Sequence, residues 1–314
     1  MNLNNLNICQ ISLKGNIPTI KENILKFKNY YPGFNLFIIC PKNQKKIFKK
    51  NINYKNCKII NEEEIISMKN FKKIANKYFI KKNYYKKIQN RLSWYYQQIL
   101  KISFIIYFVR KNKEPILMWD ADTVLLSNFD FFEEGKTIKY GTTFEFHRSY
   151  FETNKNILKK LPNYYLAFTN QFIAITPMEC EFLTKKLNKY KKREKKLSHW
   201  ITHIIISSIS RTHKIFNGSM FSEQELIGQS NLLYSYSKQR LVHGLRAGLN
   251  GKLTNLQKKI TKLFGYKYVS YEYSHPNKNN KNMLKREQSW MIFIKIIIKK
   301  SLNKIFRGFK HLLK

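Results

Sequence analysis

Two aspartates stand in an otherwise apolar run over residues 115–126. The run has the length of a strand and is rich in branched and aromatic residues, which predicts a buried β-strand. One small residue separates Asp120 from Asp122, so both side chains would lie on the same side of an extended chain. Carboxylates are rarely buried without a partner, and the run itself contains no basic residue. Two oxygen ligands at the carboxyl edge of a strand suit a hard divalent cation, Mg²⁺ or Mn²⁺, that a diphosphate helps to hold.

A simpler interpretation is that the two acids mark the end of a strand, because aspartate is common in turns. A D-x-D pattern also occurs often by chance. The run continues with Thr-Val-Leu-Leu after Asp122. This continuation favours metal binding, since the acids then interrupt a buried strand instead of ending it.

Residues 119–124, Trp-Asp-Ala-Asp-Thr-Val, resemble the metal-binding D-x-D segment of GT-A glycosyltransferases. Residues 91–101 resemble the W-Y-x-Q-Q-x-L-K helix of a bacterial group of such enzymes, and residues 222–228 also resemble that group. The three motifs occur in the expected order within residues 7–250. The resemblance implies a GT-A fold, an α/β domain with a mixed, mainly parallel sheet. It also implies transfer of a sugar from a nucleotide-diphosphate sugar to a glycan or glycolipid acceptor.

The resemblance also implies contacts with the donor. Arg91, Gln98 and Lys101 are expected to reach its phosphates or base. The alternative for these three is a solvated helix face whose aromatic residues pack inward. Asn170, together with Gln171, lies where the family places residues that face the donor sugar.

A late histidine is often an additional metal ligand in GT-A enzymes, and the resemblance assigns that position to His243. Gly244 would allow close approach of the backbone. His275 is a weaker rival, and a structural histidine is the alternative for both. Arg246 is expected to neutralise the diphosphate leaving group.

Ligands of open α/β sheets bind beyond the carboxyl ends of the strands. The loop over residues 12–16 follows the first predicted strand, so Ser12 and Lys14 are candidate nucleotide contacts. The loop lacks G-x-G-x-x-G and G-x-x-x-x-G-K-[S/T], which argues against a dinucleotide fold or a P-loop.

Two glutamates open a predicted helix near residue 223. Ser222 and Glu225 have the spacing of a capping box, which gives Glu225 a structural task. Glu223 then occupies the first helical position, near the positive end of the helix dipole. A carboxylate there could act as general base towards an acceptor hydroxyl, with Glu225 as the second candidate. The alternative is that both acids only stabilise the start of the helix.

Alternating strand and helix patterns predict βαβ units and a mainly parallel sheet. Strands are predicted at residues 7–13, 34–40, 57–60, 140–144, 168–176 and 241–246. Helices are predicted at residues 20–31, 84–109, 178–196 and 200–210. These elements form one predicted GT-A domain over residues 1–275.

The composition limits the possible environments. Of 314 residues 43% are hydrophobic, enough for a real core, yet no stretch has the length and apolarity of a membrane-spanning helix. We expect no signal peptide, and four cysteines without C-x-x-C spacing fit a reducing cytoplasm. The net charge of +40 reflects in part the general overuse of lysine, but it will attract polyanions.

The remaining residues, 276–314, read as a polar hinge followed by a basic amphipathic helix. Its basic residues recur at helical spacing: Lys295, Lys299, Lys300, Lys304, Arg307, Lys310 and Lys314. Its apolar residues share the other side: Trp290, Ile294, Ile297, Ile298, Ile305, Phe309 and Leu312. This pattern predicts peripheral binding to an anionic membrane, here the inner face of the cytoplasmic membrane, and suits a lipid-linked acceptor. The alternative is a helix packed back on the catalytic domain.

Two other functions remain open at this point. A nucleotidyltransferase on a related fold should carry a Gly-rich basic loop after its first strand, where only Gly15 is present. A non-enzymatic binder of polyanions or membranes is suggested by charge alone, but it has no need for two acids in a buried strand. Nucleic acid is therefore not the expected partner.

Overall fold

The computed structural model describes residues 6–80, 85–142, 146–163, 166–187, 196–212, 219–235, 239–246, 249–271 and 287–312. The chain divides into two compact units. The first unit comprises Met1–Lys14, Tyr31–Asp120 and Asp130–Leu241. The second unit comprises Gly15–Tyr30, Ala121–Phe129 and Val242–Lys314. The predicted domain boundary at residues 275 and 276 lies outside the described residues.

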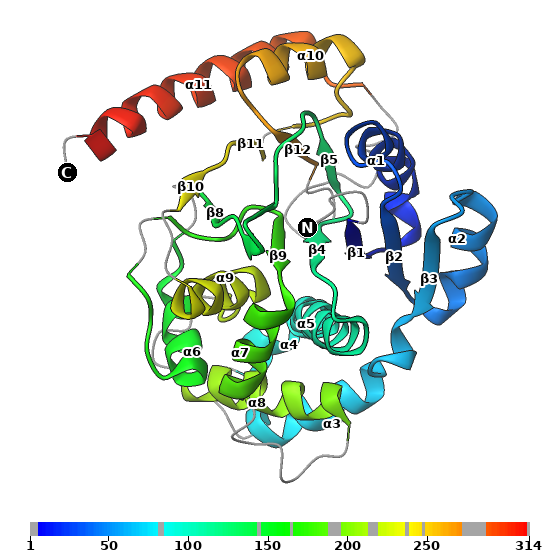
Figure 1. The fold of residues 1–314 in the computed structure, drawn as a ribbon, viewed down its shortest axis with the longest axis vertical. Helices are drawn as coiled ribbons and strands as arrows, with labels where there is room; N and C mark the ends of the chain where they lie inside the picture. The colour runs from blue at the N-terminus through cyan, green and yellow to red at the C-terminus, as the bar shows by residue number, and fades with distance from the viewer. Residues whose placement is uncertain are drawn as a thin grey trace. The chain divides into compact units, whose positions relative to one another are not determined.

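The first unit is built on a five-stranded sheet (Figure 1). Its strands, in spatial order, are β3 (Cys57–Asn61), β2 (Asn35–Cys40), β1 (Asn7–Ile11), β4 (Ile116–Trp119) and β9 (Phe172–Ile175). The first four run parallel and β9 runs antiparallel to β4. Every residue of β1 and β4 is buried, as expected for a parallel sheet covered on both faces. The predicted α/β class with a mixed, mainly parallel sheet is confirmed.

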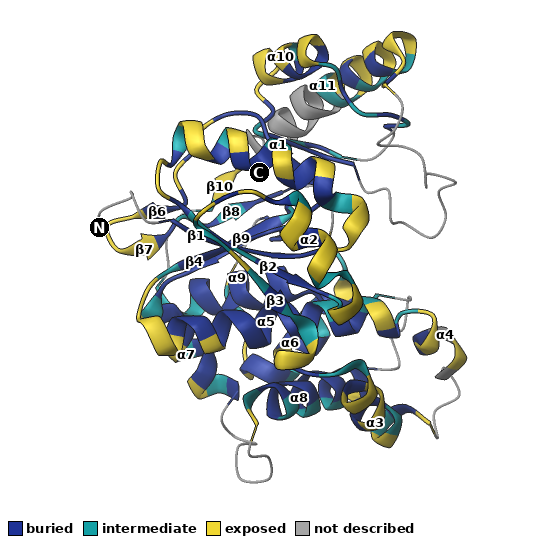
Figure 2. Ribbon diagram, turned by 90° about the vertical axis from the view of Figure 1, so that its right-hand side faces the viewer, coloured by how far each residue is buried: buried dark blue, intermediate teal, exposed yellow. Residues whose placement is uncertain are grey.

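Helix α5 (Leu92–Asn112) organises the core of the first unit. It packs against β1 and β4 and is buried along most of its length (Figure 2). The helix ends at Lys113, whose left-handed backbone (φ 57°) lets its N–H reach the Val109 carbonyl. Gln98 and Lys101 are buried within this helix. The alternative that these two residues lie on a solvated helix face is therefore wrong.

The other elements of the first unit surround this core. Its remaining helices are α2 (Lys45–Asn51), α3 (Met68–Phe79), α4 (Tyr85–Gln89), α6 (Arg148–Leu158), α7 (Pro177–Leu187), α8 (Leu197–Arg211) and α9 (Glu223–Tyr234). Short strands form two pairs: β6 (Phe132–Glu133) with β7 (Lys136–Thr137), and β8 (Tyr140–Gly141) with β10 (Arg240–Leu241). Short 3₁₀ turns of this unit are η3 (Lys42–Gln44) and η4 (Glu62–Glu64), while η2 (Lys14–Asn16) continues from Lys14 into the second unit.

The second unit contains a separate three-stranded sheet. Its strands, in spatial order, are β11 (Gly244–Leu245), β12 (Tyr268–Ser270) and β5 (Thr123–Leu125). Its helices are α1 (Ile17–Tyr30), α10 (Asn255–Leu263) and α11 (Trp290–Leu312). Buried Asn23 ties α1 to β5, because its amide donates to the Thr123 carbonyl and accepts from the Leu125 N–H. The amphipathic helix that the sequence predicts after the polar hinge is present as α11.

Three predicted strands are shorter than expected. The run with the two acids is not one strand: β4 ends at Trp119, β5 starts at Thr123, and the two belong to different sheets. Asp120 and Asp122 lie at the turn between the two strands, where their carboxylates lose less hydration than in the interior of a strand. The strand predicted at 168–176 begins only at Phe172, because Gln171 has a φ of 73° that no strand accommodates. The strand predicted at 241–246 is split into β10 and β11.

Candidate active site

Three side chains far apart in the sequence meet inside the first unit. The Lys101 ammonium, from the middle of α5, lies 2.6 Å from Asp120 Oδ1 and 2.8 Å from Glu223 Oε1. The side chains of Lys101 and Glu223 are 4% and 2% exposed, whereas that of Asp120 is 20% exposed. Asp120 directly follows β4, so this buried ionic triad lies at the carboxyl end of a parallel strand, where open α/β sheets bind ligands.

The start of α9 is fixed by two hydrogen bonds. Ser222 is the N-cap, and its hydroxyl accepts from the Glu225 N–H at 3.3 Å. Gln98 lies one turn before Lys101 on α5, and its side-chain oxygen accepts from the Glu223 N–H at 3.2 Å. Gln98 and Lys101 therefore hold the backbone and the carboxylate of Glu223 from the same helix face. The structure gives Gln98 a positioning task, and its contact with a donor stays a prediction.

The triad has one positive charge for two carboxylates. Burial lowers the pKa of Lys101, but the carboxylates of Asp120 and Glu223 offset this and leave it above its usual value. Burial raises the pKa of Glu223, and Lys101 opposes that rise only in part. Cys9 of β1 lies near the triad, and burial raises the pKa of its thiol to about 12, so it stays protonated at neutral pH. The triad therefore favours the approach of a further cation.

The segment before β9 completes the surroundings of Asp120. The Asp120 N–H donates to the Gln171 carbonyl at 2.9 Å, and Gln224 Nε2 lies 3.3 Å from Asp120 Oδ2. Gln171 has the left-handed backbone noted above, a strained conformation of the kind that gathers at functional sites. Its neighbour Asn170 is fully buried and donates to the Tyr140 carbonyl, while its side-chain oxygen accepts no hydrogen bond within the protein. A buried carbonyl oxygen without a donor is costly unless a ligand or water completes it.

Glu225 has a different environment from Glu223. It is fully buried, and its carboxylate accepts from the Phe168 N–H at 2.8 Å and from the Gln229 amide at 2.9 Å. Burial raises its pKa to about 7, against the two hydrogen bonds. Of the predicted capping box, the hydrogen bond from the Glu225 N–H to the Ser222 hydroxyl is present. The Glu225 carboxylate is bonded to Phe168 and Gln229. The carboxylate of Glu225 thus ties α9 to the segment before β9, which is a structural role.

Other predicted residues of the first unit lie in ordinary local structure. Ser12 is buried at the end of β1, and its hydroxyl donates to the Leu13 carbonyl. Lys14 is exposed, and its N–H donates to the Gln44 side chain at 2.6 Å. Arg91 is the half-buried N-cap residue of α5. Their predicted contacts with a nucleotide stay predictions.

Three predicted residues belong to the second unit. The Asp122 carbonyl accepts from the Tyr271 N–H, and its carboxylate accepts from the Thr123 hydroxyl at 3.3 Å. The His243 carbonyl accepts from the Lys267 N–H at 2.8 Å, and the Arg246 carbonyl accepts from the Lys300 ammonium. The rival histidine at position 275 lies outside the described residues. In the part of the chain that the structure describes, no three His, Cys, Asp or Glu side chains are grouped to hold a metal.

A second buried ion pair in the first unit was not predicted. Lys139 lies 3.7 Å from Glu179 Oε1, and both side chains are almost fully buried. Glu179 Oε1 also accepts from the Thr137 hydroxyl at 2.7 Å, and Oε2 accepts from the N–H and hydroxyl of Thr176, each at 2.9 Å. Nothing in the sequence around Glu179 distinguishes it from an exposed helix residue. In contrast, a lysine inside the apolar α5 could have indicated that Lys101 pairs with buried acids.

The fold and this geometry define an α/β protein with a buried ionic site at the carboxyl edge of a mainly parallel sheet. Residues 22–223 match the model of a family of unknown function, DUF6492, and the chain belongs to that family. No curated protein matches the chain. Among solved structures, the apo crystal structure of mouse xyloside xylosyltransferase 1 matches with 10% identity and a TM-score of 0.41. That match covers 87% of this chain and 100% of the other.

Proposed function

We propose that the protein is a glycosyltransferase of the GT-A type, which moves a sugar from a nucleotide-diphosphate sugar to a glycan or glycolipid hydroxyl. One observation carries the proposal. Lys101, Asp120 and Glu223 come from the three sequence motifs that resemble such enzymes, and their side chains meet in one buried triad. A nucleotidyltransferase and a simple polyanion binder give no reason for this convergence.

A divalent cation, Mn²⁺ or Mg²⁺, fits the residues present. The Asp120 carboxylate is 20% exposed at the carboxyl end of β4, where a cation can approach it. Asp122, two residues further along the chain, adds a second carboxylate ligand. When bound, the cation would stabilise negative charge on the diphosphate leaving group. His243 as a third ligand and Arg246 as a diphosphate contact stay part of the proposal.

The other residues of the triad have distinct tasks. Lys101 holds the carboxylates of Asp120 and Glu223 in one arrangement. Glu223 acts as general base towards the acceptor hydroxyl if the reaction inverts configuration, and burial raises its pKa, which makes the carboxylate a stronger base. The side-chain oxygen of Asn170 accepts a hydrogen bond from a donor-sugar hydroxyl.

Thermal unfolding in the presence of UDP-, GDP-, CMP- and TDP-sugars, each with Mn²⁺ and with EDTA, tests the proposal. At least one donor should raise the unfolding temperature with Mn²⁺, because a ligand that binds only the folded state stabilises it. Asp120→Asn should lose this effect, while Asp130→Asn, an exposed acid of the same unit, should keep it. No stabilisation by any donor, or equal stabilisation of Asp120→Asn, would contradict the proposal.

We also propose that an anionic membrane is a partner, on the evidence of two apolar faces of α11. Phe293 and Ile297 are buried in the core of the second unit. The opposite stripe is exposed by 49–68% and consists of Met291, Ile294, Ile298 and Leu302. Residues 290–312 contain no acid. Ile297, predicted on the membrane-facing side, is instead buried, so α11 packs on its unit through one face. The exposed apolar stripe beside exposed lysines supports the proposed membrane contact.

Helix α10 lies beside α11 in both views of the chain (Figures 1 and 2). It adds two exposed leucines, Leu256 and Leu263, to the apolar surface of the second unit. In the part of the chain that the structure describes, no helix has the length and apolarity needed to cross a bilayer. The proposed contact is therefore peripheral.

Co-sedimentation with vesicles tests the membrane contact. The protein should sediment with phosphatidylglycerol-containing vesicles and stay in solution with phosphatidylcholine alone. Replacing Ile294 and Ile298 by serine should release it, whereas the same change at two exposed isoleucines of the first unit, Ile47 and Ile80, should not. Equal binding of both double variants would contradict insertion of the stripe.

A further inference from the structure

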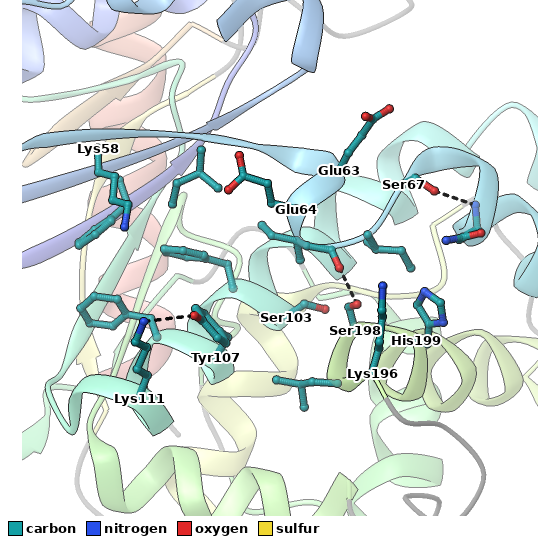
Figure 3. A pocket seen from close by; sticks show the side chains of 18 of the residues that line it. Lys58, Glu63, Glu64, Ser67, Ser103, Tyr107, Lys111, Lys196, Ser198 and His199 are labelled. Carbon is teal, nitrogen blue, oxygen red and sulfur yellow. Dashed lines mark hydrogen bonds between the residues drawn. The ribbon is translucent and has the colours of Figure 1, made fainter.

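A pocket of about 540 Å³ lies in the first unit, apart from the triad (Figure 3). It is lined by Phe37 of β2, by Lys58 and Ile60 of β3, and by residues 63–67 and Asn70. The second half of α5 and the first turn of α8 complete the lining. β3 is the edge strand of the sheet that the described residues form. The volume is in the range of small-molecule sites.

One wall of the pocket is aromatic. Phe37 of β2 packs on Phe104 and Phe108 of α5, with ring centroids 5.7 and 4.9 Å apart. Ile60 and Leu197 add aliphatic surface. This wall suits an apolar body, which would lose contact with water on binding.

The polar lining is mainly cationic. Lys58, Lys111 and Lys196 line the pocket together with His199. Figure 3 shows the first two on one side of Ser103, and Lys196 and His199 on the other. Two acids, Glu63 and Glu64, also line the pocket, and the Glu64 carboxylate is bonded to Lys45 and to the Asn61 N–H. Three lysines against two glutamates leave the lining positive. The net charge of the lining therefore favours an anion.

Two further features point to where the anion binds. The N-cap residue of α8, Lys196, gives its helix no side-chain cap, and the N-terminus of a helix attracts negative charge. Ser103 is 1% exposed and lines the pocket, yet its hydroxyl has no hydrogen-bond partner within the protein. A buried hydroxyl without a partner is costly unless a ligand or water completes it.

We propose that this pocket binds an amphipathic anion, a phosphate or carboxylate head joined to an apolar body. The head lies against Lys196, the first turn of α8 and the Ser103 hydroxyl. The apolar body lies on the wall formed by Phe37, Phe104 and Phe108. This site is separate from the triad, because neither Asp120 nor Glu223 lines it.

Isothermal titration of the full chain with octyl phosphate tests the proposal. Octyl phosphate should bind at least about tenfold more tightly than inorganic phosphate or 1-octanol, because each of these offers only half of the contacts. Octanoate in a parallel titration distinguishes a carboxylate head from a phosphate head, and tighter binding of either supports the site. Binding of inorganic phosphate or octanol as tight as that of octyl phosphate would overturn it.

Matched variants separate the pocket from the basic surface. Lys196→Gln should weaken binding of octyl phosphate about fivefold or more. Lys155→Gln, an exposed lysine of α6 outside the pocket, should leave it unchanged. Ser103→Leu should fill the pocket and abolish binding, and its unfolding temperature shows whether it is folded. Asp120→Asn should bind octyl phosphate as the unaltered protein does. Equal affinities of Lys196→Gln and Lys155→Gln would overturn the proposal.

Discussion

The first unit contains two buried ionic clusters that differ in the balance of charge and in exposure. In one, a single lysine, Lys139, faces a single carboxylate, Glu179, and neither side chain is more than 1% exposed. In the other, Lys101 faces both Asp120 and Glu223, and Asp120 is partly open to solvent. A closed, balanced cluster is suited to stability. An open cluster with a surplus carboxylate is suited to binding a cation.

The hydrogen bonds of the two clusters show the same difference. The carboxylate of Glu179 is held by the backbone and hydroxyl groups of Thr137 and Thr176, so its lone pairs are used within the protein. Burial lowers the pKa of Lys139, which Glu179 opposes only in part. At Lys101 the two carboxylates outweigh burial and raise the pKa of the ammonium above its usual value. The surroundings of Lys101 thus favour its charged form more strongly than those of Lys139 do.

The largest effect is expected from Lys101→Met, which removes the positive charge between the buried carboxylate of Glu223 and the partly exposed carboxylate of Asp120. It should lower the free energy of unfolding at pH 7 by about 4 kcal/mol. Because burial already raises the pKa of Glu223, the penalty should shrink as the pH falls and the carboxylate takes up a proton. Urea unfolding at pH 5 and pH 7 measures this. A penalty that grows at pH 5 would contradict the assigned charges.

Breaking the closed cluster at its acid should come next. Glu179→Gln replaces two acceptor oxygens by one and places an amide N–H₂ against the donors of Thr137 or Thr176. Urea unfolding should show a loss of about 3 kcal/mol, because buried donors then lack partners. Donor binding, once found, should be unchanged in this variant. A loss below about 1 kcal/mol would show that the cluster is not needed for stability.

Glu225 is a third buried carboxylate of the first unit, held by hydrogen bonds from Phe168 and Gln229. Its pKa of about 7 in the folded chain exceeds the ordinary 4.5, so the folded state binds its proton more tightly than the unfolded state. This contribution to stability is complete below pH 4.5 and is lost as the pH rises through 7. The full change is on the order of 3 kcal/mol at most. Glu225→Gln should remove this part of the pH dependence of urea unfolding, and an unchanged profile would contradict the shift.

The smallest effect on stability is expected from Glu223→Gln. It removes one of two carboxylates that share Lys101, and the remaining amide oxygen can still accept from the ammonium. Urea unfolding should change by about 1 kcal/mol or less. If Glu223 is the general base, sugar transfer should nevertheless fall about 100-fold or more. A stability loss as large as that of Glu179→Gln would place Glu223 in a structural role.

The sequence was informative where local patterns determine structure. The apolar runs that became β1, β2 and β4 predicted a parallel sheet, and three motifs indicated the residues that meet in the triad. The turn at Asp120 matches the simpler interpretation, that the acids mark the end of a strand. The sequence favoured one continuous strand, because apolar residues flank the acids on both sides although they serve two sheets. The left-handed backbone of Gln171 was also missed, since no glycine marks that position.

Contacts between distant residues were the least predictable. Lys101 was expected to meet a phosphate and instead lies on two carboxylates, from Asp120 and from a helix that starts at Glu223. The partner of the buried acids thus comes from another element, which the apolar run itself cannot reveal. The pair of Lys139 and Glu179 has no sequence signal for the same reason.

The central claim is that the open cluster of Lys101, Asp120 and Glu223 is the site of sugar transfer. It is tested most directly by the Mn²⁺-dependent release of nucleoside diphosphate from the donor that stabilises the protein, comparing Asp120→Asn with Glu179→Gln at a temperature where both are folded. We predict that Asp120→Asn loses about 100-fold or more of this activity, while Glu179→Gln keeps it. Equal activity of the two variants, or release that persists in EDTA, would contradict the claim.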